Sequence, residues 1–391
     1  MESSGARQST LRASNLGLVL RTVCAAAQPI SRADVAGATG MTRATAARLV
    51  DQLVIGGLLD VGERLALPRR GRPATPLLPG SGFAALGLQV DAGLLAARVL
   101  DLRGRIVAEK VEDGDFGNSD PAATLGRLGA LAAELRVGLP ATVRLVGAGL
   151  ALPGIVDVDA GVLLRAPNLG WSDERPAEHL PDGLDPLLGN EADLAARTVA
   201  EVAPGRAGPH RDFVYLSGQI GVGGAAVLGG RVMTGSDGWA GEMGHVCVDP
   251  DGPACRCGST GCLEQYAGRS ALLKAAGLPL DADPRELAAR VADGDEAARA
   301  AVDTAAWALG VALAGVVNVL DIPTVVLGGS LGELADLLGP RVEEHLARRV
   351  LSARWRRPTI EPADNAPAAG ATGAALRALG DVLVDPGRWL P

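Results

Sequence analysis

Four potential metal ligands stand close together in the second half of the chain. His245, Cys255, Cys257 and Cys262 follow the spacing His-x9-Cys-x-Cys-x4-Cys. Three thiolates and one imidazole suit a tetrahedral Zn²⁺ site, and four protein ligands leave no open position, so the ion would be structural rather than catalytic. The alternative is a loop of small buried residues without a ligand. We predict one Zn²⁺ per chain, because three of the five cysteines fall within eight residues beside glycines that permit a tight loop.

Two carboxylates flank these ligands, and a loop held by a metal would fix both of them. Glu242 lies three residues before His245, and Glu264 lies two residues after Cys262. One ring nitrogen of His245 could bind the metal while the other donates to a ligand. Paired carboxylates and an imidazole are good partners for a polyhydroxylated ligand, whereas isolated glutamates would be solvated surface charges. We therefore expect a ligand site beside the loop.

The residues of this loop resemble the signature of a known family. Glu242-Met-Gly-His245, followed by Cys255-Arg-Cys-Gly-Ser-Thr-Gly-Cys262-Leu-Glu264, is similar to the motif of the ROK family, which groups repressors, open reading frames and sugar kinases. The resemblance extends over about residues 13–380. It implies an α/β body with the two-lobed ribonuclease-H-like fold of actin-like ATPases and sugar kinases. It also places the sugar contacts at Asn168, Asn190, Glu191, Glu242, His245 and Glu264.

The segment 13–80 has the pattern of a DNA-binding head. Apolar residues recur at helical spacing from Leu16 to Val23 and predict a first helix. Ser31-Arg-Ala-Asp34 is a capping box that opens a second helix, which would end near Gly40, and Thr42 would cap a third. Two short helices around a glycine turn are typical of a helix-turn-helix motif. The resemblance to ROK repressors implies the winged form.

The limits of this head are also predicted from the pattern. Residues 1–12 are polar, and we expect them to be a disordered tail. The stretch Val61–Leu67 could form the hairpin of the wing. Residues 1–80 hold ten arginines and five acids, whereas the whole chain has a net charge of −8. A basic head on an acidic body fits contact with double-stranded operator DNA through the head.

Two sets of side chains are candidates for this DNA contact. The helix that begins after Thr42 would enter the major groove with its N-terminal side chains foremost. These are Arg43, Ala44, Thr45 and Arg48. Arg43 could read guanine or bind phosphate, and the sequence leaves both open. Arg69, Arg70 and Arg72 stand beside Gly71 and Pro73 and would suit a narrow minor groove, although a basic linker would have the same composition.

The rest of the chain alternates predicted strands and helices. Strands near 84–90, 95–100 and 105–110, a helix near 121–137 and a strand near 143–149 favour an α/β domain with a mainly parallel sheet. We expect a small lobe over 83–190, on which 367–391 packs back, and a large lobe over 191–366 that contains the zinc loop 245–262. The apolar run Ala305–Leu320 is short for a membrane span and predicts a buried helix. Reduced cysteines and the lack of a convincing secretory signal favour a cytoplasmic protein without a membrane partner.

The loops that bind nucleotide in ROK kinases are altered here. Family kinases carry D-x-G-G-T in the first turn, where this chain has Asp91-Ala-Gly93-Leu-Leu95, and Gln219 replaces a threonine in a second loop. Leucine supplies no donor and blocks close approach of phosphate. Glu191 stands at the position of the catalytic aspartate, and a displacement near 1 Å can cost about 10²-fold in rate. We therefore expect no kinase activity. Asp91 and Gly328-Gly329 still match the pattern of the family kinases, so a sugar kinase remains the alternative.

The sequence as a whole predicts a sugar-responsive transcriptional regulator, by resemblance a repressor. It would bind its operator as a homodimer or homotetramer, because operators of such heads have two half-sites. One alternative is an ATP-dependent sugar kinase with an added DNA-binding head. Another is a DNA-binding protein that needs no ligand and whose body serves only assembly.

Overall fold

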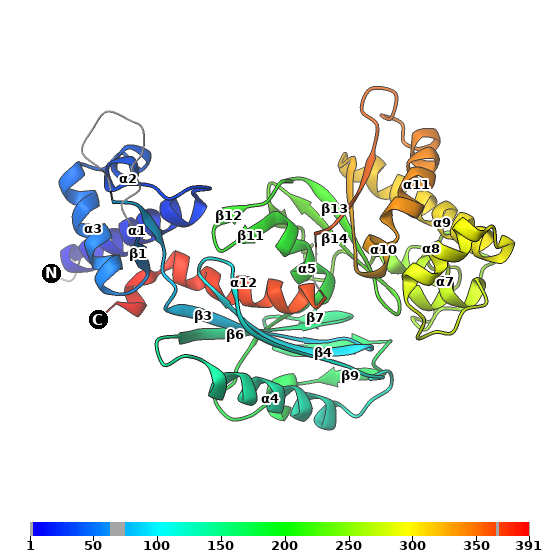
Figure 1. Ribbon diagram of the computed structural model, residues 1–391, viewed down its shortest axis with the longest axis horizontal. Coiled ribbons are helices and arrows are strands. Elements are labelled where there is room, and N and C mark those ends of the chain that lie inside the picture. Colours follow the sequence, from blue (N-terminus) through cyan, green and yellow to red (C-terminus); the bar gives the residue numbers. More distant parts are fainter. Residues whose placement is uncertain (1–2, 63–74, 365–366, 391) are drawn as a thin grey trace.

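The computed structural model describes residues 3–62, 75–364 and 367–390 (Figure 1). Three parts follow one another along its longest axis. A helical head lies at the left of Figure 1, a sheet with helices on both faces lies in the middle, and a second sheet with a group of helices lies at the right. The N-terminal and C-terminal ends both lie at the head.

The head contains the three predicted helices. They are α1 (Ser3–Ala25), α2 (Arg32–Thr39) and α3 (Arg43–Ile55). The capping box is present, since Ser31 N donates to Asp34 Oδ2 at 2.9 Å and Asp34 N donates to Ser31 Oγ at 3.2 Å. Gly40 ends α2 with φ 68°, which a glycine adopts without strain, and the hydroxyl of Thr42 caps α3. Residues 1–12, which we expect to be a disordered tail, overlap α1, because this helix begins at Ser3.

The wing is built from strands that lie further apart in the sequence than predicted. β1 (Leu59–Val61) pairs antiparallel with β2 (Leu77–Pro79). Most of the hairpin expected over Val61–Leu67 falls in residues 63–74, outside the described residues. The predicted DNA contacts Arg69, Arg70 and Arg72 lie outside them as well.

The small lobe is a five-stranded sheet in the order β10-β6-β3-β4-β5. Its strands are β3 (Phe83–Val90), β4 (Leu94–Asp101), β5 (Ile106–Asp113), β6 (Arg144–Leu152) and β10 (Leu187–Asn190). Helix α4 (Pro121–Gly138) covers one face and α12 (Ala369–Val384) covers the other (Figure 1). A smaller sheet, β7 (Ile155–Asp157), β8 (Val162–Ala166) and β9 (Trp171–Glu174), extends the lobe, with η1 (Pro176–His179) after it.

The large lobe contains a second five-stranded sheet in the order β15-β14-β13-β16-β17. Its strands are β13 (Phe213–Gly218), β14 (Val222–Leu228), β15 (Arg231–Val232), β16 (Thr324–Gly328) and β17 (Thr359–Pro362). The prediction of mainly parallel sheets was wrong, because in each sheet tight turns join successive strands on one side, and short turns can join only antiparallel strands.

Helices surround this second sheet. They are α5 (Glu191–Ala200), α6 (Glu264–Ala267), α7 (Arg269–Ala275), α8 (Pro284–Asp293), α9 (Glu296–Leu320), α10 (Gly329–Glu333) and α11 (Ala335–Arg349). A short pair, β11 (Glu201–Ala203) and β12 (Arg206–Ala207), follows α5. The predicted buried apolar helix is α9. Its length of 25 residues and mean hydropathy of 1.7 would suit a membrane span, but it packs against α6, α7, α8 and α11, and 61% of its apolar window is buried.

The head and the small lobe share one hydrophobic core. Buried residues of all three head helices pack with residues of β3, β4 and α12 in a single cluster. The Arg21 guanidinium of α1 donates to the carbonyl of Leu383 at 2.9 Å. The short helix η3 (Pro386–Trp389) closes this contact, with the Trp389 ring edge-on to Phe83 at 6.4 Å. The head is therefore held against α12 by packing.

Candidate functional site

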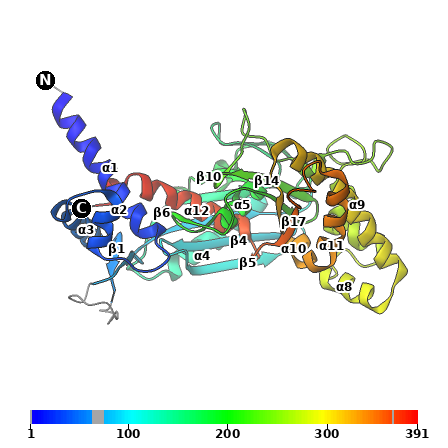
Figure 2. The ribbon, with the colours of Figure 1, turned by 90° about the horizontal axis from the view of Figure 1, so that it is seen from above.

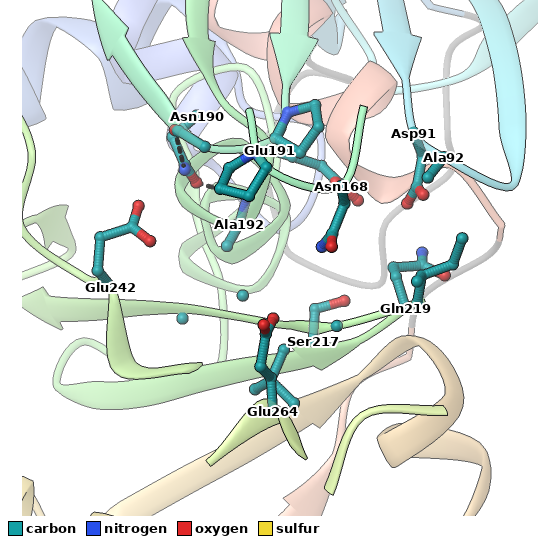
Figure 3. Close-up of a pocket in the computed structure, with 18 of the residues that line it drawn as sticks. Asp91, Ala92, Asn168, Asn190, Glu191, Ala192, Ser217, Gln219, Glu242 and Glu264 are labelled. Carbon is teal, nitrogen blue, oxygen red and sulfur yellow. Dashed lines mark hydrogen bonds between the residues drawn. The ribbon is translucent and has the colours of Figure 1, made fainter. Parts of the chain in front are cut away.

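A pocket lies between the two lobes, and the structure brings all the predicted sugar contacts to it (Figure 3). Its lining includes Asn168, Asn190, Glu191, Glu242, His245 and Glu264. The small lobe supplies the first two, α5 supplies Glu191, the loop before α6 supplies Glu242 and His245, and Glu264 is the first residue of α6. In Figure 3 the labelled carboxylates of Glu242 and Glu264 lie on one side of the space, and Asp91 lies across from them.

Asn190 lines the pocket and also has a structural role as the cap of α5. It ends β10 and caps α5, since its Oδ1 accepts from the backbone N–H of Ala192 at 2.8 Å and of Asp193 at 3.2 Å. Its Nδ2 donates to the carbonyl of Gly154 at 2.9 Å. These bonds fix the junction between strand and helix, and so they fix the direction of the neighbouring Glu191.

Glu191 is turned toward two buried side chains of the small lobe. Gln89 Nε2 donates to Glu191 Oε1 at 2.9 Å, and the buried carboxyl of Asp91 lies close enough to act on Glu191 electrostatically. Burial raises the pKa of both carboxyl groups, and the negative charge of Asp91 raises that of Glu191 further. The site therefore disfavours two negative charges on this pair at the same time.

Gln89 was not predicted from the sequence. It is 1% exposed, and its Oε1 accepts from the backbone N–H of Ala371 at 3.0 Å. One side chain thus joins Glu191 in the pocket to the first turn of α12. The signal that could have found it is its polarity, because Gln89 is the one polar residue of a strand that is buried along its whole length.

Glu242, His245 and Glu264 form the opposite wall. Nε2 of His245 lies 3.8 Å from Glu242 Oε2, and Nδ1 lies 4.0 Å from Glu264 Oε1. Glu264 opens α6 and its side chain is 6% exposed. Burial raises the pKa of Glu242. Two acceptors and one imidazole donor thus face the same space, as a ligand with several hydroxyl groups requires.

The four predicted metal ligands form one cluster behind this wall. The ligand atoms of His245, Cys255, Cys257 and Cys262 all lie within 4.8 Å of one another. The Sγ atoms of Cys257 and Cys262 are 3.7 Å apart, and Cys255 Sγ is 3.7 Å from His245 Nδ1. Two sulfurs at about 2.3 Å from a tetrahedral Zn²⁺ would be about 3.8 Å apart, so the geometry fits a metal ion. Since Nδ1 faces the cysteines, Nε2 is directed to the pocket side.

Gly221 lets the two lobes approach at the floor of the pocket. A Cβ on this residue would lie 2.4 Å from Glu264 Oε2 and 2.9 Å from Asn168 Nδ2. The turn around it, Gly218-Gln-Ile-Gly221, follows β13, where a family kinase would hold phosphate. The sequence analysis treated this turn only as an altered phosphate loop. In the structure Gly221 leaves room for the side chains of Asn168 and Glu264, which are two of the predicted sugar contacts.

The DNA-binding candidates that the structure describes lie on the N-terminal part of α3. Arg43, Ala44 and Arg48 are exposed, as contact with a groove requires. Thr45 is half-buried, and its hydroxyl is 2.9 Å from that of Thr42. Its hydroxyl therefore belongs to the helix cap, and only its methyl group remains for a base.

Known proteins resemble this chain over two different lengths. The xylose repressor of Caldicellulosiruptor bescii is 25% identical over 395 residues, which cover 96% of this chain and 98% of that protein. The N-acetylmannosamine kinase of Escherichia fergusonii is 32% identical over 313 residues, which cover 77% of this chain and all of the kinase. A solved structure of a ROK family transcriptional regulator, described as a homolog of the Escherichia coli MLC protein, superposes with a TM-score of 0.75 at 24% identity. It covers 96% of this chain and 98% of that one, and so confirms the fold, including the head.

The family itself follows from a direct match. The family model described as the ROK family matches residues 99–380, which is more than half of the chain. The match runs through both lobes, the zinc loop and α12. Together with the cluster and the pocket described above, it establishes that this chain belongs to the ROK family.

Proposed function

We propose that this protein is a sugar-responsive transcriptional repressor. Its head would bind operator DNA, and a sugar or sugar derivative would bind in the pocket between the lobes. One observation carries the proposal: the head shares its core with α12, and α12 is tied through Gln89 to Glu191 in the pocket. The similarity to xylose repressors over nearly the whole chain supports the same function.

The contacts provide a route from pocket to head. A sugar hydroxyl that bonds to Glu191 competes with the bond from Gln89 and changes the interaction with the Asp91 carboxyl. Gln89 also holds the N–H of Ala371, so a change at Glu191 is passed to the first turn of α12, whose other end packs on α1. Lobe closure would then move the two heads of a dimer relative to their half-sites. The ligand acts by binding one arrangement more tightly than the other.

The DNA contact would use α3 and the segment beyond the wing. Arg43, Ala44, Thr45 and Arg48 would lie in the major groove, and Arg69, Arg70 and Arg72 in an adjacent minor groove. Two copies of the chain would place two such heads on a palindromic operator, as a homodimer or as part of a homotetramer. We place this activity in the cytoplasm.

The alternative of a sugar kinase meets a specific obstacle. A general base must be ionised to take a proton from the sugar hydroxyl. Glu191 stands at the base position, but burial and the neighbouring charge of Asp91 raise its pKa well above the usual range, which disfavours the ionised form that a base requires. The replacement of phosphate-loop residues by Leu94, Leu95 and Gln219 acts in the same direction.

The metal cluster would serve the sugar pocket as a support. His245, Cys255, Cys257 and Cys262 would hold one Zn²⁺ with no open position, so the ion would be structural. Its effect would be to fix the loop that carries Glu242, His245 and Glu264. One ring nitrogen of His245 would bind the ion while the other points to the sugar.

The experiment that tests the function is fluorescence anisotropy with labelled DNA from upstream of the protein's own gene. We expect tight, sequence-specific binding at fixed salt, and release by one member of a panel of sugars and sugar phosphates. Arg48→Ala should weaken this binding by about 10-fold or more, because each good base or phosphate contact contributes roughly 1–3 kcal/mol. A coupled ADP-release assay checks the alternative. Robust ADP release by the unmodified protein in the presence of a sugar would contradict the proposal that the pocket is the effector site of a repressor.

A further inference from the structure

A second groove begins where the sugar pocket ends. Asn190 lines both of them. From there the groove runs between α5, α12 and the loop 229–239 as far as Arg21 of the head. Its volume is about 1520 Å³, whereas the sugar pocket has about 80 Å³, which is room for roughly six water molecules. The pocket is therefore the smaller of the two spaces, and a ligand larger than one sugar ring can continue past Asn190 into the groove.

The floor of the groove near Asn190 has unused hydrogen-bonding groups. Among the described residues, the buried Oδ1 of Asp193 has no hydrogen-bond partner. Arg377, which also lines the groove, donates one N–H to the carbonyl of Leu188 at 2.6 Å. Within the described part of the chain no carboxylate forms an ion pair with this guanidinium, although Asp193 acts on it electrostatically. Asp193 and Arg377 thus lie at the groove with hydrogen-bonding capacity that the described residues do not use.

The same groove also has a flat apolar surface in its lining. Trp239 lines the same groove, and 43% of the residue is exposed. A buried carboxylate oxygen is stabilised by a hydrogen-bond donor, and an unpaired guanidinium is stabilised by a hydrogen-bond acceptor. A hydroxyl group is both at once, and the C–H face of a sugar ring packs on an aromatic ring. A neutral polyol offers both a donor for Asp193 and an acceptor for Arg377, whereas a fully ionised phosphate offers only acceptors.

We propose that this groove is a second sugar subsite and that the effector contains at least two linked sugar units. The first unit occupies the pocket at Glu242 and Glu264. The second lies over Asn190, with its hydroxyls bonded to Asp193 and Arg377 and one ring face on Trp239. This inference rests on the proposed function, because it extends the same ligand site. It limits the effector to disaccharides and longer saccharides or to glycosides with a sugar-like second group.

The test compares matched monosaccharides and disaccharides by calorimetry on the full-length protein. The probes are xylose with xylobiose, glucose with cellobiose and maltose, and N-acetylglucosamine with chitobiose. We expect at least one disaccharide to bind about 10-fold or more tightly than its own monosaccharide. Trp239→Ala should remove most of that difference and leave the monosaccharide affinity unchanged. Trp355→Ala is the matched control, since this tryptophan is 71% exposed and lies on the large lobe away from the groove.

The outcomes separate the subsite from the proposed function. Equal affinity for each disaccharide and its monosaccharide would overturn the subsite and leave the repressor function standing. Loss of both affinities to the same degree in Trp239→Ala would also overturn it. Asp193→Asn repeats the comparison at a position where the change keeps the shape of the side chain, and it should weaken only the disaccharide. If no sugar of either length binds, the proposed function fails together with the subsite.

Discussion

Replacing Asp193 by asparagine is expected to stabilise the protein at neutral and alkaline pH. Burial is the main cause that raises the pKa of Asp193 from 3.8 to about 7, and the negative charge of Glu242 adds to it, while Arg377 offsets part of the effect. The Oδ1 atom has no hydrogen-bond partner in the described structure. The ionised side chain is therefore held in a place that solvates it poorly.

The sign of the pH dependence follows from these pKa values. The folded state binds the Asp193 proton more tightly than the unfolded state, so the free energy of unfolding falls as pH rises from about 4 to about 7. A shift of about 3 pH units corresponds to roughly 4 kcal/mol at full effect, and partial hydration of the side chain reduces this to about 2 kcal/mol. Asparagine removes the penalty but also the favourable charge in the first turn of α5, which contributes roughly 0.3–1 kcal/mol. The net gain above pH 7 is about 1–2 kcal/mol.

Urea unfolding of the ligand-free protein at pH 5, 6, 7 and 8 measures this effect. The difference between Asp193→Asn and the unmodified protein should be smallest at pH 5, where roughly a third of the effect has developed, and it should grow to pH 7 and level off by pH 8. Asp336→Asn is the matched control, because Asp336 stands in the first turn of α11 and is exposed. It should lose only the small helix-dipole contribution. Two parallel pH profiles for Asp193→Asn and the unmodified protein would refute the reasoning.

Three further predictions concern the pocket, its link to α12 and the metal. Gly221→Ala places a methyl group 2.4 Å from Glu264 Oε2, so calorimetry should show at least a 10-fold loss of sugar affinity while anisotropy shows unchanged operator binding; full sugar affinity would contradict the pocket geometry. Gln89→Leu removes the bonds of Gln89 to Glu191 and to the N–H of Ala371, which keeps its bond to the carbonyl of Ala368 at 3.1 Å, so it should cost about 1–3 kcal/mol in urea unfolding and weaken sugar-induced release of DNA; a cost below about 1 kcal/mol would contradict the link. Cys257→Ser should reduce bound Zn²⁺ measured by elemental analysis and lower sugar affinity, and undiminished zinc would show that the cluster is not the metal site.

Local patterns predicted the parts of this protein whose chemistry is local. The cap at Ser31, the glycine that ends α2, and the cap at Thr42 were confirmed because each depends on residues a few positions apart. The close approach of the four metal ligands was also predictable, since their spacing permits one tight loop. The resemblance to the ROK family predicted the other positions of the site, such as Asn168, which lines the same pocket as Glu264.

The features that patterns missed depend on contacts between distant parts of the chain. Gln89 and Ala371 are separated by 282 positions, and nothing near Gln89 indicates its partner. The antiparallel halves of both sheets were missed because the alternation of strands and helices was weighted above the short turns. Asp193 Oδ1 has no hydrogen-bond partner among the described residues, and this too can be recognised only once α5 and α12 are placed side by side.

The shared core of the head and α12 has a consequence for biosynthesis. The ribosome makes α1, α2 and α3 first, but one wall of their core, including Leu379 and Val382, is made only after both lobes. A nascent chain therefore carries α3 on a head that still exposes apolar surface. The core of the head is completed only when synthesis is nearly finished, and a prematurely terminated chain lacks the part of that core that α12 contributes.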